Sequence, residues 1–277
     1  MGWRGHLQLN YRVSDTGRSV LHATHSGPLR VLKSLYPEGD ARCHSVLVHP
    51  PGGVVGGDVL EIDLDLASGA QALVTTPGAT RFYRSAGAPA LQALNARVAG
   101  AARLEWLPLE TIAHSGCLAT NRMRFDLDAG AEMIGWDVLA LGLPAADQPF
   151  ARGRFTQRIE LPGRWLDQGT VDAADRRLLD SPLGWAGRRV LATLWFAAGS
   201  ALASERRTRL VDAARDLANA SSLAPTSGAT APQPGVVVLR ALAARVEPAM
   251  GLLVDVWRAW RDVAWGLEGE APRIWRT

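Results

Sequence analysis

Cysteine is scarce in this sequence, because its 277 residues include only Cys43 and Cys117. Two cysteines cannot form a disulfide scaffold, and alone they cannot supply the four ligands of a structural zinc site. Long apolar runs are missing as well. The longest candidate, residues 190–202, is shorter than the roughly 18–20 residues of a membrane helix, and polar residues interrupt it. The N-terminus also lacks the apolar stretch of a secretory signal. We therefore expect a soluble, cytoplasmic protein with no membrane contact.

Lysine is nearly absent too, since Lys33 is the only one and the other long basic side chains are arginines. The 30 basic and 27 acidic residues leave a net charge of only +3. The arginines are scattered, and no basic motif interleaved with aromatic residues is found. We therefore expect no nucleic-acid partner.

Alternating apolar and polar residues predict β-strands over residues 1–199. Residues 59–66 (VLEIDLDL) place four aliphatic side chains on one side of a strand and three acids on the other. The same alternation recurs at 102–106 and at 122–128. With 47% hydrophobic and 21% charged residues, the chain has the composition of a folded globular protein. We predict a single domain over residues 1–277.

A weak internal repeat indicates how these strands are arranged. Short turns at 68–70, 99–101 and 129–131 recur about every 30 residues, each between two strand-like runs. We interpret each unit as a hairpin, and hairpins of this kind stack to bury faces that a lone hairpin leaves exposed. The predicted fold is therefore mainly β, with layered, stacked β-sheets in a β-helix-like scaffold.

The pattern changes to helical in the part from 200 to 277. Apolar residues at helical spacing predict about two helices, at 204–220 and 247–266, and an apolar run predicts a strand at 236–242. Between the first helix and this strand, residues 221–235 are rich in Pro, Ser, Thr and Ala, which predicts a mobile loop. The tryptophans of the last helix are expected in the core rather than at a ligand.

The glycine-rich run at 50–58 (PPGGVVGGD) is the most conspicuous local motif. A phosphate-binding loop would end in Gly-Lys-Ser/Thr and open a helix, whereas this run ends in Asp58 and precedes a strand. The carboxylate would repel a phosphate. We therefore predict that the glycines serve positive φ angles or a close approach of strands, and that Asp58 accepts backbone hydrogen bonds or touches a metal.

Other chemical motifs are few. No nucleophile elbow or zinc-protease motif is present, and no spacing rule selects Glu105 and Glu110 as a glycosidase-type acid pair. The six histidines show no closed four-ligand pattern, so a structural or surface role is their default interpretation. The histidines are His6, His22, His25, His44, His49 and His114. From the residues alone, we expect no tightly bound cofactor, and a binding or scaffold role is slightly favoured.

Eight segments, taken in order over nearly the whole chain, resemble the urease accessory protein UreD family, called UreH in some organisms. The sequence departs from the family pattern at Arg81, Leu109 and Leu143, where lysine, glutamine and arginine are usual, and this puts a local interface or passage in question. The matching segments are 27–30 with 36–39, 49–58, 75–85, 104–108, 110–112, 135–136 and 272–275.

The resemblance implies a scaffold that is not an enzyme. Proteins of this family bind the urease apoprotein and recruit UreF and, through it, UreG, the GTPase that carries nickel for the dinickel centre. An internal passage for nickel in transit is proposed for the family. The acids inside the matching motifs are the candidates to line it, against the alternative that they pair with arginines. These candidate residues are Asp58, Glu105, Glu110 and Asp137.

Two other functions stay open at this point. One is a small-molecule hydrolase or lyase that uses Asp58, Glu105 or Glu110, and the other is a nickel-storage protein, which would need a rich His/Cys cluster. A scaffold would co-purify with UreF and urease, whereas an enzyme would turn over its substrate alone.

Overall fold

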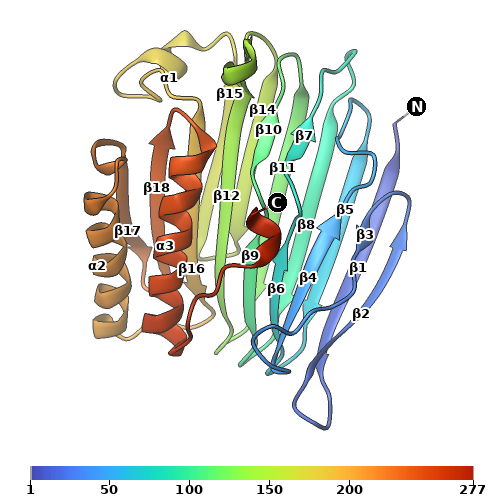
Figure 1. Ribbon diagram of the computed structural model, residues 1–277, viewed down its shortest axis with the longest axis vertical. Helices are drawn as coiled ribbons and strands as arrows, with labels where there is room; N and C mark the ends of the chain where they lie inside the picture. Colours follow the sequence, from blue (N-terminus) through green and yellow to red (C-terminus); the bar gives the residue numbers. More distant parts are fainter. Residues whose placement is uncertain (1, 277) are drawn as a thin grey trace.

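A computed structural model describes residues 2–276 as two stacked β-sheets with helices on one side (Figure 1). The first sheet has the strand order β15-β14-β11-β8-β5-β1-β2, and the second has β17-β18-β16-β12-β9-β6-β4-β3 with three short strands attached. The predicted fold class is confirmed. The strands of the first sheet are β1 (Arg4–Val13), β2 (Ser19–Ser26), β5 (Val59–Leu66), β8 (Ala90–Val98), β11 (Leu118–Leu127), β14 (Arg154–Leu161) and β15 (Trp165–Asp172). Those of the second are β3 (Arg30–Val31), β4 (Arg42–Val48), β6 (Gln71–Thr75), β9 (Arg103–Leu107), β12 (Glu132–Leu143), β16 (Val190–Ala198), β17 (Ser227–Gln233) and β18 (Val236–Ala243), with β7 (Thr80–Phe82), β10 (Thr111–Ala113) and β13 (Gln148–Pro149).

The repeated turns connect the two sheets to each other. They join β5 to β6, β8 to β9 and β11 to β12, so each turn crosses from the first sheet to the second. Neighbouring strands such as β5 and β8, or β6 and β9, are consequently parallel. The prediction of hairpins was wrong, because a tight turn between two strands looks the same in sequence whether the strands pair or cross. Successive turns stack through hydrogen bonds, as from Gly69 N to Gly100 O at 3.3 Å.

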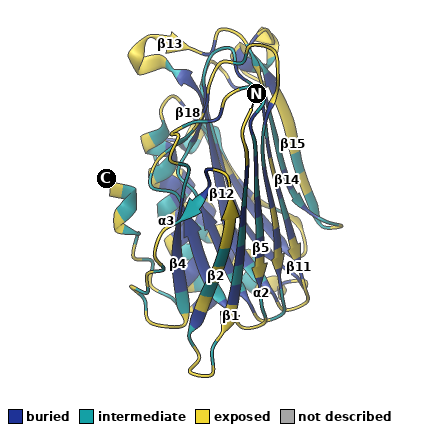
Figure 2. Cartoon of the chain, turned by 90° about the vertical axis from the view of Figure 1, so that its right-hand side faces the viewer, coloured by how far each residue is buried: buried dark blue, intermediate teal, exposed yellow. Residues whose placement is uncertain are grey.

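Two buried layers result from this arrangement. One lies between the sheets, and the other lies between the second sheet and the helices. In Figure 2 the strands of both sheets are largely coloured as buried, and the exposed residues lie mainly in the loops and at the margins. Inward and outward side chains alternate along each strand, so one strand of the second sheet serves both layers. Among the described helices, none is long and apolar enough to cross a membrane.

The helices α2 (Ser204–Ala220) and α3 (Val246–Trp265) agree with the sequence prediction, and a short α1 (Arg176–Asp180) precedes them. The prediction of a loop was wrong for 227–233, which form β17 at the edge of the second sheet. Its residues pair with β18, for example Ala229 with Leu239. Composition does not reveal such pairing, because the hydrogen bonds come from the backbone. Three 3-10 turns complete the chain: η1 (Pro144–Ala146), η2 (Ala224–Thr226) and η3 (Arg273–Arg276).

The glycine-rich run forms a tight loop at one end of the two sheets, as predicted. Gly52 and Gly57 adopt φ angles of +76° and +94°, which side chains disfavour. At Gly56 the constraint is contact, since an added Cβ would lie 2.3 Å from Ser85 Oγ. The loop therefore has a fixed shape, and it borders the cavity described next.

Candidate functional site

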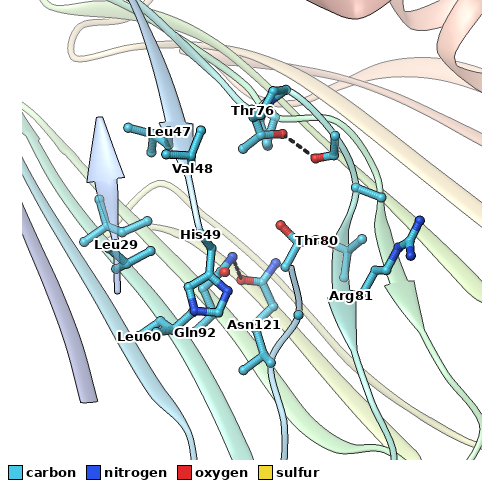
Figure 3. Close-up of a pocket in the computed structure, with 18 of the residues that line it drawn as sticks. Leu29, Leu47, Val48, His49, Leu60, Thr76, Thr80, Arg81, Gln92 and Asn121 are labelled. Carbon is cyan, nitrogen blue, oxygen red and sulfur yellow. Dashed lines mark hydrogen bonds between the residues drawn. The ribbon is translucent and has the colours of Figure 1, made fainter. Parts of the chain in front are cut away.

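The second sheet splits beside β4, and a cavity occupies the split. Strands β4 and β6 pair as far as Val46 with Thr75. Beyond that point β4 continues beside β3, while the chain after β6 turns away through residues 76–79. The cavity has a volume of about 360 Å³ and extends from this split to Asp137 between the sheets. Figure 3 shows side chains from β4, from the 76–81 segment and from the first sheet around it.

His49 lies at the outer part of this cavity. It follows the last residue of β4, and its imidazole has no hydrogen-bond partner among residues 2–276. Burial lowers the pKa of His49, although Asp58 opposes this shift. The ring is therefore neutral near pH 7 and has a free nitrogen lone pair, the form that binds metals. No sequence pattern distinguished His49 from the other five histidines.

Asp137 lies at the inner end of the cavity and is almost fully buried. Its Oδ1 accepts a long hydrogen bond of 3.5 Å from Asn121 Nδ2. Burial raises the pKa of Asp137 to about 7; the nearby amide of Gln157 lowers it and the charge of Asp167 raises it. The carboxyl group can therefore exchange a proton, or a proton for a cation, near neutral pH.

Three amide side chains stand in register opposite Asp137, on the inner face of the first sheet. Asn121 pairs with Gln92 on one neighbouring strand and with Gln157 on the other. Gln92 Nε2 donates to Asn121 Oδ1 at 3.4 Å. On the second sheet, Asp137 pairs with Thr193. We call Gln92, Asn121, Gln157, Asp137 and Thr193 the polar row.

The polar row crosses an otherwise apolar layer and reaches the edge of the sheets. Thr193 pairs with Arg240 on β18, and Arg240 forms an ion pair with Asp167 on β15. Asp167 and Arg240 are partly exposed, whereas Asn121 and Thr193 are buried. The row therefore joins the cavity to the opposite, solvent-facing edge.

Several polar atoms along this route are buried without a partner. Both amide atoms of Gln157 and the indole Nε1 of Trp106, which lines the cavity, make no hydrogen bond within the described part of the chain. Buried polar groups usually have partners, and those that lack a protein partner mark places where water or an ion completes the bonding. The space between the sheets is thus suited to a hydrated species.

The four predicted acids do not form one row. The Asp58 carboxylate accepts hydrogen bonds from the backbone N–H groups of Trp3 (2.7 Å) and Val55 (2.9 Å), which fix the glycine-rich loop; this confirms its predicted backbone role. Glu110 precedes β10, and its half-buried side chain has no hydrogen-bond or ion-pair partner in residues 2–276. Only Asp137 lines the cavity.

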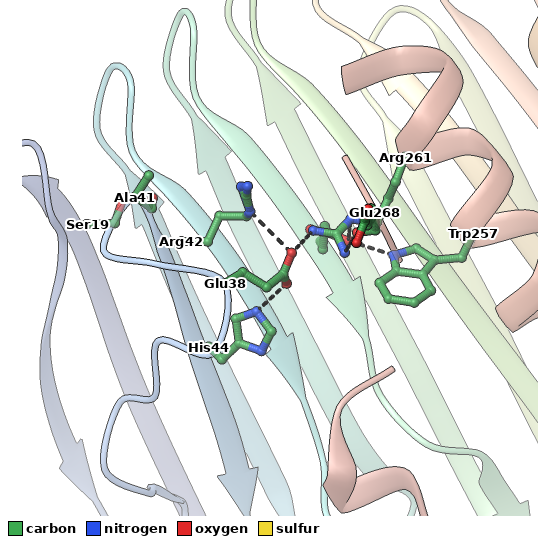
Figure 4. A network of polar contacts seen from close by, with 9 residues as sticks. Ser19, Glu38, Ala41, Arg42, His44, Trp257, Arg261 and Glu268 are labelled. Carbon is green, nitrogen blue, oxygen red and sulfur yellow. Dashed lines mark hydrogen bonds and ion pairs between the residues drawn. The ribbon is translucent and has the colours of Figure 1, made fainter. Parts of the chain in front are cut away.

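Glu105 points to the other face of the second sheet, toward α3. Its Oε2 accepts a hydrogen bond of 2.6 Å from Trp257 Nε1 and lies 3.4 Å from Arg261 Nε. Arg261 also binds Glu38 at 2.5 Å, and Glu38 accepts a 2.8 Å hydrogen bond from His44 (Figure 4). Burial raises the pKa of Glu105, opposed by Arg261. Burial alone would raise the pKa of Glu38 too, but His44 and Arg261 outweigh it and lower that pKa to about 2.

This network fastens α3 to the sheet through Oε2 of Glu105. Within residues 2–276, no three His, Cys, Asp or Glu side chains converge on a point that could hold a metal ion. A cation in this protein would therefore meet separate, weak oxygen and nitrogen donors rather than a closed cage.

Of the three departures from the family pattern, Arg81 lies at the cavity, Leu109 lies beside it and Leu143 lies in the other buried layer. Arg81 lines it and keeps the positive charge of lysine. Leu109 contributes its backbone N–H, which donates to Thr76 Oγ1 at 2.9 Å, so the loop does not depend on that side chain. Leu143, at the end of β12, packs against the apolar layer below the helices.

Comparison with known proteins gives a consistent answer. The family model described as UreD urease accessory protein matches residues 4–276. A urease accessory protein UreD of Leptothrix cholodnii is 60% identical to this chain over the full length of both. Proteins of the same name from Albidiferax ferrireducens and Paracidovorax citrulli are 58% and 59% identical over 99% of each chain. With these matches and the stacked-sheet fold, the chain belongs to the UreD family of urease accessory proteins.

Proposed function

We propose that this protein is a cytoplasmic scaffold, not an enzyme, that binds the urease apoprotein and recruits UreF and UreG for nickel delivery. Family membership and relatives named as urease accessory proteins support this proposal. The arrangement of the acids argues against a hydrolase or lyase. Asp58 accepts two backbone hydrogen bonds in the loop before β5, whereas Glu105 accepts one from Trp257 on the helix side of the second sheet. A pair of carboxylates flanking a substrate bond is therefore missing at these two positions.

The scaffold also carries a route for nickel, which is its cargo. We place this route through the cavity and along the polar row, from His49 past Asp137 to Asp167. Nickel is a borderline ion that binds imidazole firmly and carboxylate or water more loosely. Separate weak donors let an ion leave each position as readily as it arrives, which is the condition for conduction along a pore.

The observation that carries this proposal is the environment of Asp137. It is a buried carboxylate with one long hydrogen bond, beside a cavity and a row of amides that have free polar atoms. Such a group costs stability unless an ion or water completes its bonding. A purely structural acid would be paired, as Glu105 is on the opposite face.

The test is to make Asp137→Asn and His49→Gln, with Asp63→Asn as a matched control. Asp63 is a carboxylate on the outer face of the first sheet, bonded to His6 and away from the cavity. Each variant is expressed with UreF, UreG and urease. We expect both cavity variants to co-purify with the partners while nickel content and urease activity fall, and the control to match the wild type. Unchanged nickel content in Asp137→Asn would remove the route from the proposal.

A further inference from the structure

One half of the outer face of the second sheet has no helix on it. Helices α2 and α3 pack on β12, β16, β17 and β18, and Figure 1 shows β3 and β4 without a helix in front of them. The segment η3 forms the border of the area that the helices cover. It is held there by Trp275, which donates a 2.7 Å hydrogen bond to Thr75 on β6. Beyond Thr75 no described helix covers the sheet up to its edge. His44 and Val46 of β4 are nevertheless buried there, so the exposed apolar side chains lie at the edge segment.

The part of the sheet without a helix carries two exposed leucines at its edge. Leu32 donates a backbone hydrogen bond to Val46, and Leu35 bridges to His44, so both extend the edge of the sheet beside β4. Their side chains are 48% and 54% exposed. With the half-buried Val48 they form what we call the outer strip.

The dimensions of the outer strip match one α-helix. It spans β4 and the edge segment, between Thr75 and Leu32, which is two strand spacings or about 10 Å. An α-helix with its side chains is about 10–12 Å across. A helix laid there would continue the layer that α2 and α3 begin on the same sheet.

The charges around the outer strip are mainly basic. Arg30 is on β3 and bonds only to the backbone carbonyls of Gly27 and Leu29, and Arg81 lines the neighbouring cavity. Four further charges belong to the elements that border the strip, three basic and one acidic. They are Lys33, Arg273, Arg276 and Glu110, none of which forms an ion pair within residues 2–276. Such a rim favours an acidic ligand and disfavours a basic one.

We propose that the outer strip binds an acidic amphipathic helix of a partner protein, whose apolar stripe covers Leu32 and Leu35. Helices that bury an i, i+3, i+4 stripe in an apolar groove are a common mode of recognition. Val48 belongs both to the strip and to the lining of the cavity. A helix bound there lies over the split in the sheet, so docking places the partner at the outer end of the nickel route. In this respect the inference rests on the proposed function.

The first experiment measures binding of the full-length chain to purified UreF and to urease apoprotein. Leu32→Glu combined with Leu35→Glu puts two acids on the strip, and Val20→Glu is the control. Val20 is 42% exposed on β2 of the other sheet, so the control adds a similar charge at similar exposure. We expect the double variant to lose affinity for one partner by at least about tenfold, and the control to bind like the wild type. Because all three side chains are exposed, melting temperatures should stay within a few degrees.

A second set of experiments tests the role of the basic residues around the strip and the identity of the bound segment. Arg273→Glu with Arg276→Glu should weaken the same complex severalfold at low salt, with a smaller difference at high salt. A photo-crosslinking amino acid at position 35 should attach to a helical segment of that partner with acidic residues beside an apolar stripe. Crosslinking to a second copy of this chain, or to a basic segment, would overturn the inference.

The outcomes separate the two proposals. If the wild type and the Val20→Glu control bind and the double leucine variant binds equally well, the docking inference fails and the proposed function stands. If the wild type binds neither partner, both fail together.

Discussion

The two faces of the second sheet each hold a buried carboxylate, and their surroundings differ. On the helix side, Glu105 receives a 2.6 Å hydrogen bond from Trp257 and lies 3.4 Å from Arg261. On the side facing the first sheet, Asp137 receives one hydrogen bond of 3.5 Å and borders a cavity. Both are at most 6% exposed, so burial does not distinguish them. Their partners do: the paired acid holds two layers together, and the acid that lacks strong partners remains available to a ligand.

The largest loss of stability is expected when Arg261 is removed from the centre of the ion-pair network on the helix side. Arg261→Met removes a fully buried guanidinium that serves Glu38 and Glu105. Loss of one partner of a buried ion pair leaves uncompensated charge and typically costs about 3–5 kcal/mol. We expect a loss of this order in the free energy of unfolding, measured with urea. A loss below about 1 kcal/mol would show that α3 does not depend on this network.

Neutralising each acid in turn compares the two faces directly. Glu105→Gln should cost about 1–3 kcal/mol, because the amide weakens a charged hydrogen bond and leaves Arg261 with one carboxylate. Asp137→Asn should change the free energy of unfolding by less than about 1 kcal/mol, since it removes a buried charge with one long hydrogen bond. Nickel delivery should show the reverse order, with Asp137→Asn more impaired. Equal losses of stability would contradict the difference between the two faces.

Asp137 on one face and Glu38 on the other should also respond oppositely to pH. The pKa of Asp137 is raised to about 7 in the fold, so the folded state holds its proton more tightly than the unfolded chain does. This contribution to stability is present below about pH 4 and is lost as pH rises to about 7. The pKa of Glu38 is lowered to about 2, so its contribution is present above about pH 4.5 and is lost as pH falls toward 2.

The measurement is urea unfolding across this pH range for wild type, Asp137→Asn and Glu38→Gln. Asp137→Asn should reduce the decline in the free energy of unfolding between pH 4 and 7 and leave the loss of stability below about pH 4.5 unchanged. Glu38→Gln should reduce only the loss of stability below about pH 4.5. If one variant removes both slopes, the two layers are not independent.

The smallest effect on stability is expected within the polar row. Gln157→Leu replaces an amide whose two polar atoms have no partner in the described residues. Removing a buried, unbonded polar group in favour of an apolar one of similar shape is neutral or stabilising, so we expect a gain of up to about 1 kcal/mol. Nickel content of co-expressed urease should nevertheless fall. A stability gain with full nickel delivery would show that the row has no role in transport.

Some residues of this site were predicted from the sequence, and two more could have been. Asp137 was among the candidates, whereas His49 was not separated from the other histidines. Gln92 and Asn121 lie 29 residues apart, close to the spacing of the repeated turns, and both fall on inward positions of their strands. Polar residues repeated at that spacing are a usable signal for a polar row. Gln157 lies outside the repeat, because the chain between β11 and β14 is longer.

The sequence by itself determined the local structure. Alternation predicted the strands, helical spacing predicted α2 over Ser204–Ala220, and the glycine-rich run predicted a constrained loop. These features depend on backbone conformation and on which side chains share a face, and both are properties of neighbouring residues.

Only the tertiary structure decided what each face meets. Residues 132–143 are apolar on both sides of the strand, so periodicity could not place Asp137 between the sheets. The alternation at 102–106 set Glu105 on the polar side of its strand, but it could not show that α3 covers that side. That placement depends on turns that cross between the sheets and on Arg261, which meets Glu38 over a separation of 223 residues. Contacts so distant in sequence leave no local pattern, because the two residues come together only when the whole chain has folded.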